Sequence, residues 1–131
     1  MRHLPMSFSI AAFTLATTLF GCSSKDDAVA LGDMTVGTQT FHVEREGPEV
    51  AAGAKTRFVL KVATGAKPTS VTGWVGLESA EGSTKYKAAY DEADGDFDDD
   101  VTCPTPLPTG SKIWFDVMNG DTKTTGSIAI K

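Results

Sequence analysis

The chain has few of the residues on which several classes of protein depend. It holds two cysteines and two histidines in 131 residues, which leaves no cluster of soft metal ligands and at most one internal disulfide. Twelve basic residues stand against 17 acidic ones, a net charge of −5, and no basic stripe is present to hold phosphates. Nucleic-acid binding is therefore disfavoured.

Only the N-terminal segment contains a sustained apolar run. Arg2 precedes fourteen residues, Ser7 to Phe20, that include no charged side chain, and this order of a basic region and an apolar region is typical of a secretory signal. The run is shorter than the ~20 residues that a helix needs to cross a bilayer. It therefore predicts an export signal and not a spanning helix.

The four residues that end this run are Leu19-Phe20-Gly21-Cys22, and they resemble the lipobox of bacterial lipoproteins, although Phe20 is bulkier than is usual there. The resemblance implies cleavage between Gly21 and Cys22, acylation of Cys22, and a lipid anchor outside the cytoplasm. Ser23 after the cysteine is similar to residues that send such proteins to the periplasmic side of the outer membrane in Gram-negative cells. The alternative is an ordinary secretory signal, which would leave Cys22 as a thiol.

We expect three segments: a signal peptide at 1–21, a flexible tether at 22–34 and one β-domain at 35–131. Removal of the signal leaves 110 residues, one domain's worth of chain. Arg2 is the only charged residue lost, so the mature charge is −6. With Cys22 acylated, Cys103 is the remaining thiol, and its phase with Phe97 and Val101 predicts that it is buried.

Short alternating runs separated by turn residues predict an all-β domain. We count seven: Thr40–Arg45, Thr56–Ala63, Ser70–Glu78, Lys85–Tyr90, a fifth through Phe97 and Cys103, a sixth from Lys112 to Val117, and a seventh that ends at Ile130. Asp94-Gly95 predicts a hairpin, and Asn119-Gly120 predicts a type I′ turn. A proline-rich segment, 104–108, is expected to cross between sheets. The predicted fold is an immunoglobulin-like β-sandwich of about seven antiparallel strands.

Three further features resemble the periplasmic immunoglobulin-like modules of YtkA-like and FixH-like proteins. They are the glycine-to-phenylalanine strand at Gly53 to Phe58, the Asp-Gly-x-Phe step at Asp94 to Phe97, and the Leu-Pro-x-Gly segment before an aromatic strand, Leu107 to Phe115. The resemblance implies a small periplasmic sandwich. The chain departs from it at Trp114, which is out of phase with the inward residues of its strand.

The sequence offers little to catalysis. The one histidine after Cys22 is His42, on the polar face of a predicted strand, where a solvated side chain is the simpler interpretation. We therefore predict no enzyme and no cofactor.

Among possible metal ligands, the acidic run at 91–100 has the strongest local excess of carboxylates in the chain. It could hold Ca²⁺, but Ala93 breaks EF-hand spacing, and a solvated turn is the simpler interpretation. A copper site would need His42, Met34, Met118 and Cys103, which show no paired spacing. No metal ligand is assigned.

Trp74 and Trp114 are both out of phase with the inward residues of their strands, which predicts an interaction surface on an outer sheet face. For Trp74 the favoured interpretation is a bulge at Gly73 or Gly76 that turns its side chain into the core, whereas for Trp114 both positions stay open. The expected function is a lipid-anchored, non-catalytic binding or assembly module for an envelope protein or a glycan. The alternative is a periplasmic ligand or metal carrier, for Ca or Cu, that uses the acidic loop or the Met, His and Cys groups.

Overall fold

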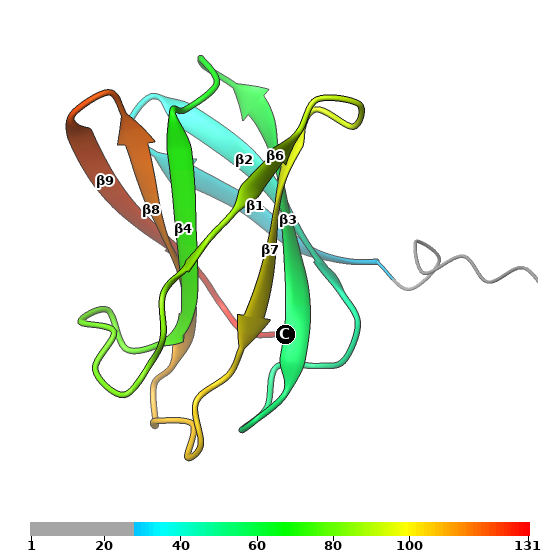
Figure 1. Cartoon of the computed structure of the whole chain (residues 1–131), viewed down its shortest axis with the longest axis vertical. Helices are drawn as coiled ribbons and strands as arrows, with labels where there is room; N and C mark the ends of the chain where they lie inside the picture. Colours follow the sequence, from blue (N-terminus) through cyan, green and yellow to red (C-terminus); the bar gives the residue numbers. More distant parts are fainter. Residues whose placement is uncertain (1–27) are drawn as a thin grey trace, which may run out of the picture.

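Residues 28–131 are described by the computed structural model, and they form nine strands and no helix (Figure 1). The strands are β1 (Val29–Val36), β2 (Gln39–Glu46), β3 (Lys55–Thr64), β4 (Ser70–Gly76), β5 (Tyr86–Lys87), β6 (Ala89–Asp91), β7 (Asp96–Thr102), β8 (Lys112–Asn119) and β9 (Thr122–Ile128).

The strands make two antiparallel sheets that pack face to face. One sheet has the order β1-β2-β3-β7-β6 and the other β5-β4-β8-β9. When β1 is left out, β2, β3, β7 and β6 correspond to the first, second, fifth and fourth strands of an immunoglobulin-like sandwich, which share one sheet. Strands β4, β8 and β9 correspond to the third, sixth and seventh, and β5 is an added edge strand of that second sheet. The predicted fold class is confirmed. The proline-rich connection leads from β7 in one sheet to β8 in the other, as expected.

The core lies between the sheets and follows the alternation read from the sequence. In β2, β3 and β8, apolar residues two positions apart are buried, because successive side chains point to opposite faces. The predicted inward residues that are fully buried are Phe41, Val43, Phe58, Leu60, Val71, Val75, Phe97, Val101, Cys103, Ile113, Phe115 and Val117. Phe58 and Phe115 join the two sheets with an edge-on ring contact, their centroids 6.1 Å apart.

The predicted boundary between tether and domain is wrong. Strand β1 begins at Val29, and Leu31, Met34 and Val36 are buried in the core. At a register shift between Ala30 and Gly32, the buried residues Leu31 and Met34 are three positions apart and not two, so the alternation that marks a strand is interrupted there. Residues 29–34 therefore belong to the sandwich.

Two local predictions are also corrected. The fourth predicted run divides into β5, which pairs with β4, and β6, which pairs with β7. In the β8–β9 hairpin, Asn119 pairs with Thr122, so the loop residues are Gly120 and Asp121. Only Gly120 of these two has positive φ, at 62°, which indicates a type II′ turn and not type I′.

Candidate functional site

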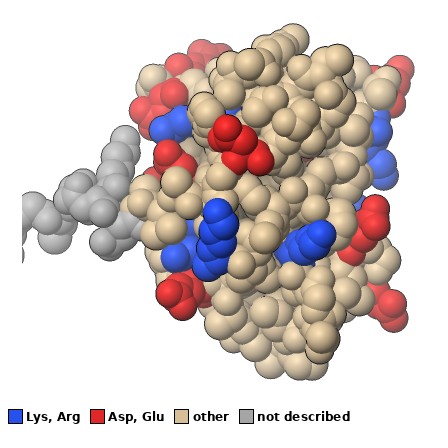
Figure 2. Space-filling view, turned by 180° about the vertical axis from the view of Figure 1, so that it is seen from behind, with Lys and Arg blue, Asp and Glu red and all other residues tan. Residues whose placement is uncertain are grey.

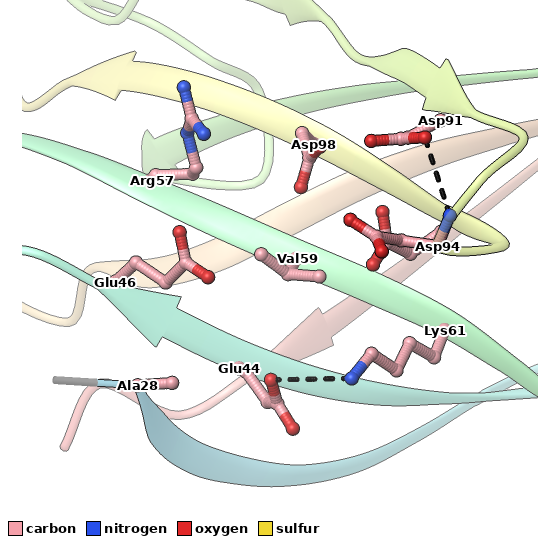
Figure 3. A pocket seen from close by; sticks show the side chains of 10 residues that line it. Ala28, Glu44, Glu46, Arg57, Val59, Lys61, Asp91, Asp94 and Asp98 are labelled. Atoms are coloured by element: carbon pink, nitrogen blue, oxygen red, sulfur yellow. Dashed lines mark hydrogen bonds and ion pairs between the residues drawn. The ribbon is translucent and has the colours of Figure 1, made fainter. Parts of the chain in front are cut away.

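A charged recess of about 540 Å³ lies on the outer face of the five-stranded sheet (Figure 3). Its lining has six carboxylates, two basic groups and two small apolar residues: Glu44, Glu46, Asp91, Asp94, Asp96, Asp98, Arg57, Lys61, Ala28 and Val59. The formal charge of these residues together is −4. A recess of this composition favours a positively charged ligand.

Strand pairing brings these residues together from distant parts of the sequence. One row across the sheet runs from Lys61 of β3 through Asp96 of β7 to Asp91 of β6. The next row holds Glu44, Val59 and Asp98. Because side chains alternate along a strand, Asp96 and Asp98 of β7 both point out to the recess.

Both basic groups already have acidic partners. The guanidinium of Arg57 donates from Nε to Asp100 Oδ1 at 3.0 Å and from Nη2 to Asp100 Oδ2 at 3.3 Å. Lys61 Nζ lies 3.8 Å from Glu44 Oε2. Among the described residues Asp96 has no ion-pair partner within 4.0 Å, although it faces Lys61 in the register.

Two recess carboxyls, those of Asp96 and Asp98, have a raised pKa. Burial raises the pKa of Asp96, and repulsion from Asp98 and Asp94 adds to it. Burial likewise raises the pKa of Asp98, with Arg57 opposing. Outside the recess, the hydrogen bonds from Arg57 lower the pKa of Asp100. The recess carboxyls whose pKa is raised are thus the two on β7.

At that end three carboxylates converge. One oxygen from each of Asp91, Asp94 and Asp96 lies within 4.8 Å of the others. Asp96 is only 4% exposed, and its Oδ1 has no hydrogen-bond partner. The acidic run therefore has a built geometry, which its spacing in the sequence did not predict.

The two tryptophans lie on the outer face of the four-stranded sheet, as their phase predicts. They pair across β4 and β8 and stack with centroids 6.3 Å apart and an interplanar angle of 14°. Trp74 is nevertheless 1% exposed, its indole N–H donates to the carbonyl of Leu77, and the ammonium of Lys85 lies 4.3 Å from its ring centroid. Trp74 is therefore buried, as the favoured interpretation had it, but under the outer face of the four-stranded sheet and not in the core, so it does not form part of an exposed surface.

Trp114 is half-buried, and its indole N–H donates to the carbonyl of Gly76 at 3.0 Å. Lys112 is 5.9 Å from its ring centroid. The role of Trp114 in an interaction surface stays a prediction.

The residues considered for copper do not share one place. Met34 and Cys103 are buried in the core, whereas His42 is exposed on the outer face of β2 and bonds Asp33. Met118 lies on β8 in the other sheet. Burial of Cys103 confirms the sequence prediction.

The signal and the lipid-attachment residues, Gly21 and Cys22, lie outside the described residues. Among the residues that are described, none belongs to a helix long and apolar enough to cross a membrane.

Four recess residues were not singled out by the sequence: Glu44, Glu46, Arg57 and Lys61. Glu44, Arg57 and Lys61 alternate with apolar residues in predicted strands, so their outward direction was readable, and Glu46 directly follows the first of these strands. Which strands are neighbours was not readable, and that pairing makes the recess.

Comparisons with protein-family models, with curated proteins and with solved structures found no match. The likeness to YtkA-like and FixH-like modules therefore stays a prediction.

Proposed function

We propose that this protein is a lipid-anchored protein of the bacterial cell envelope, whose β-sandwich is a non-catalytic module that binds a positively charged ligand. The observation that carries the binding part is the recess with six carboxylates and two basic groups, both of them engaged by carboxylates. Six neighbouring carboxylates in one hollow create a negative potential that attracts cations and is weakened by salt.

The rest of the surface supports this choice of site. Val29 is the one large hydrophobic residue exposed among those described, so no apolar patch competes as an interface. Figure 2 shows that on the face opposite to that of Figure 1 charged side chains of both signs are scattered in small groups. A glycan site at the tryptophans is less well supported, because Trp74 is covered.

The anchor and the recess are close along the chain. Ala28 lines the recess and follows Cys22 by six residues. Six residues span at most about 22 Å even when fully extended. An acylated Cys22 would therefore hold the recess near the membrane surface, within reach of cationic groups of other envelope components.

The anchor is tested by the intact mass of protein extracted from membranes. We expect cleavage before Cys22 and the added mass of acyl chains, and we expect Cys22→Ala to lose both the acyl mass and retention by the membrane. A wild-type mass without acyl chains would overturn the anchor.

The recess is tested by titration of the mature chain, carrying Cys22→Ser, with a pentalysine peptide at low salt. We expect backbone amide resonances of β3, β6 and β7 to shift, and the double variant Glu46→Gln with Asp98→Asn to weaken binding by at least about threefold. The matched control, Glu78→Gln with Glu81→Gln, removes two charges from the exposed loop after β4. Shifts spread over the whole molecule, or equal losses in both variants, would contradict a specific recess.

A further inference from the structure

The β6–β7 hairpin holds its acidic residues in a defined arrangement. Asp91 and Asp96 are opposite each other in the strand pair, and the N–H of Gly95 donates to the carbonyl of Asp91 at 2.7 Å. Oδ1 of Asp91 accepts hydrogen bonds from the N–H groups of Ala93 at 2.9 Å and Asp94 at 3.3 Å. The turn thereby brings the carboxylate of Asp94 to those of Asp91 and Asp96, and Figure 3 shows the contact between Asp91 and Asp94.

Asp96 gives independent evidence that a ligand belongs here. Its side chain is more than nine-tenths buried, it lies within the group of three carboxylates, and its Oδ1 has no hydrogen-bond partner. A buried carboxylate oxygen without a partner is costly, so native proteins nearly always satisfy one with a donor, water or ion. The nearest basic residue in the register, Lys61, is directed to Glu44.

We propose that Asp91, Asp94 and Asp96 form a site for a hard divalent cation, with Ca²⁺ as the preferred ion. The inference rests on the proposed function, because these three residues line one end of the same recess. The ligand at this end of the recess is a metal ion, whereas the rest of the recess could still bind a larger cationic group.

The ligand chemistry selects this ion. Calcium takes six to eight oxygen ligands at about 2.3–2.6 Å, so two ligands on opposite sides of the ion are about 4.6–5.2 Å apart. The three carboxylate oxygens, all within 4.8 Å of one another, fit around one such ion. Magnesium requires a tighter octahedron at about 2.0–2.1 Å and releases its water reluctantly. Zinc prefers nitrogen and sulfur, and the group contains carboxylates alone.

Three protein ligands leave several coordination positions to water or to a ligand in the recess. We therefore expect an affinity in the range of extracellular calcium modules, with a dissociation constant of about 10⁻⁴–10⁻³ M. Calcium concentrations outside the cytoplasm suit such a site.

The test is calorimetric titration of the mature chain, carrying Cys22→Ser, with CaCl₂ after removal of metal by a chelator. We expect one Ca²⁺ per chain, weaker binding of Mg²⁺, and a thermal midpoint that rises with calcium. Asp96→Asn, which keeps the shape of the side chain, should reduce calcium affinity by at least about tenfold. The control Asp100→Asn makes the same change on the same face of β7, at a residue paired with Arg57 and outside the group, and should change affinity by less than about threefold.

A second readout separates lost binding from lost folding. In chelator, Asp96→Asn should melt at or above the wild-type temperature, because it removes an unpartnered buried charge, but its midpoint should not respond to calcium. If Asp96→Asn does not fold, Asp94→Asn, at an exposed turn position, replaces it with the same expected loss of affinity.

Absence of calcium binding up to about 10 mM, ten times the weakest expected constant, would overturn the metal site. Equal losses in Asp96→Asn and Asp100→Asn would overturn it as well. The pentalysine titration tests the proposed function separately. Binding of the peptide without calcium binding would support a recess that binds cationic groups but no metal ion, and failure of both titrations would overturn the proposed function as well.

Discussion

Asp99 is a carboxylic acid inside the sandwich. The alternation of β7 that points its neighbours outward points Asp99 toward the other sheet, where it is 2% exposed and its Oδ2 would lie 2.5 Å from a Cβ built on Gly73. Burial raises the pKa of Asp99 to about 7, and the backbone of Gly73 opposes the rise. The lack of a side chain at Gly73 is what makes room for this carboxyl group.

The raised pKa predicts how stability depends on pH. In the unfolded chain Asp99 ionises near its ordinary pKa of 3.8, but in the folded chain it keeps its proton until about pH 7. The unfolded state therefore gains from ionisation as pH rises between these values, and the free energy of unfolding falls, by about 2–4 kcal/mol for this group. Above about pH 8 the loss is complete.

We expect Asp99→Asn to be more stable than wild type at pH 8 by about 2–4 kcal/mol, with little difference at pH 4. Urea unfolding at both pH values measures this. Asp100→Asn is the control: Arg57 lowers the pKa of Asp100, so its contribution is lost only as pH falls below about 4, and the change between pH 5 and 8 should match wild type. An Asp99→Asn curve parallel to wild type would contradict the assignment.

Cys103 is the second residue whose burial predicts chemistry. It is 2% exposed in the core, and burial raises the pKa of its thiol. Because the thiolate is the nucleophile, we expect the folded mature chain, with Cys22→Ser, to react with a disulfide reagent at pH 8 at least about a hundredfold more slowly than the same chain in urea. Rapid labelling of the folded chain would show an accessible thiol, and disulfide-linked dimers would then have to be considered.

At the scale of elements, β1 is the strand that changes the boundaries of the domain. It pairs with β2 through Val36 and Gln39 at the Gly37–Thr38 turn, and it also contacts β9, where a Cβ on Gly126 would lie 3.1 Å from Met34 Sδ. The strand thus closes the gap between the two sheets at one edge.

A pair of substitutions in β1 distinguishes a strand from a tether. Leu31 is 1% exposed, whereas Val29 on the same strand is 40% exposed. We expect Leu31→Ala to reduce the free energy of unfolding by about 2–5 kcal/mol, through lost burial and a cavity, and Val29→Ala to change it by less than about 0.5 kcal/mol. Urea unfolding compares the two. A flexible segment at 29–34 would leave both variants at wild-type stability.

At the scale of the whole molecule, one core cluster joins the two sheets. It includes residues from β1, β2, β3, β4, β7, β8 and β9, so neither sheet buries its apolar face without the other. The stacked tryptophans lie on the four-stranded sheet alone, whereas circular dichroism follows the strands of both sheets.

This arrangement predicts cooperative unfolding. In urea we expect tryptophan fluorescence and far-ultraviolet circular dichroism to give the same midpoint, with a slope of about 1–3 kcal/mol per molar urea. Two separated midpoints would mean that one sheet persists without the other.

The fold was predictable to a large extent because the information lies in local alternation. Residues such as Phe58 and Leu60, or Ile113 and Phe115, show a period of two that requires no knowledge of their partners. Strand β1 was not predicted because its bulge interrupts that period. For Trp74 the sequence favoured the core, whereas the side chain is buried on the outer face, where Leu77 and Lys85 from the irregular segment after β4 contact it.

The sequence by itself determined that the folded part of the chain is a β-sandwich and which strand faces are apolar, because alternation is a property of neighbouring residues. Export and acylation of Cys22 stay predictions from the order of charged and apolar residues at the N-terminus. Tertiary structure decided which strands adjoin, and so which outward charges meet. Lys61, Asp96 and Asp91 form one row only through the pairing of β3 with β7 and of β7 with β6. Register between distant strands depends on the packing of the whole core, and no local pattern encodes it.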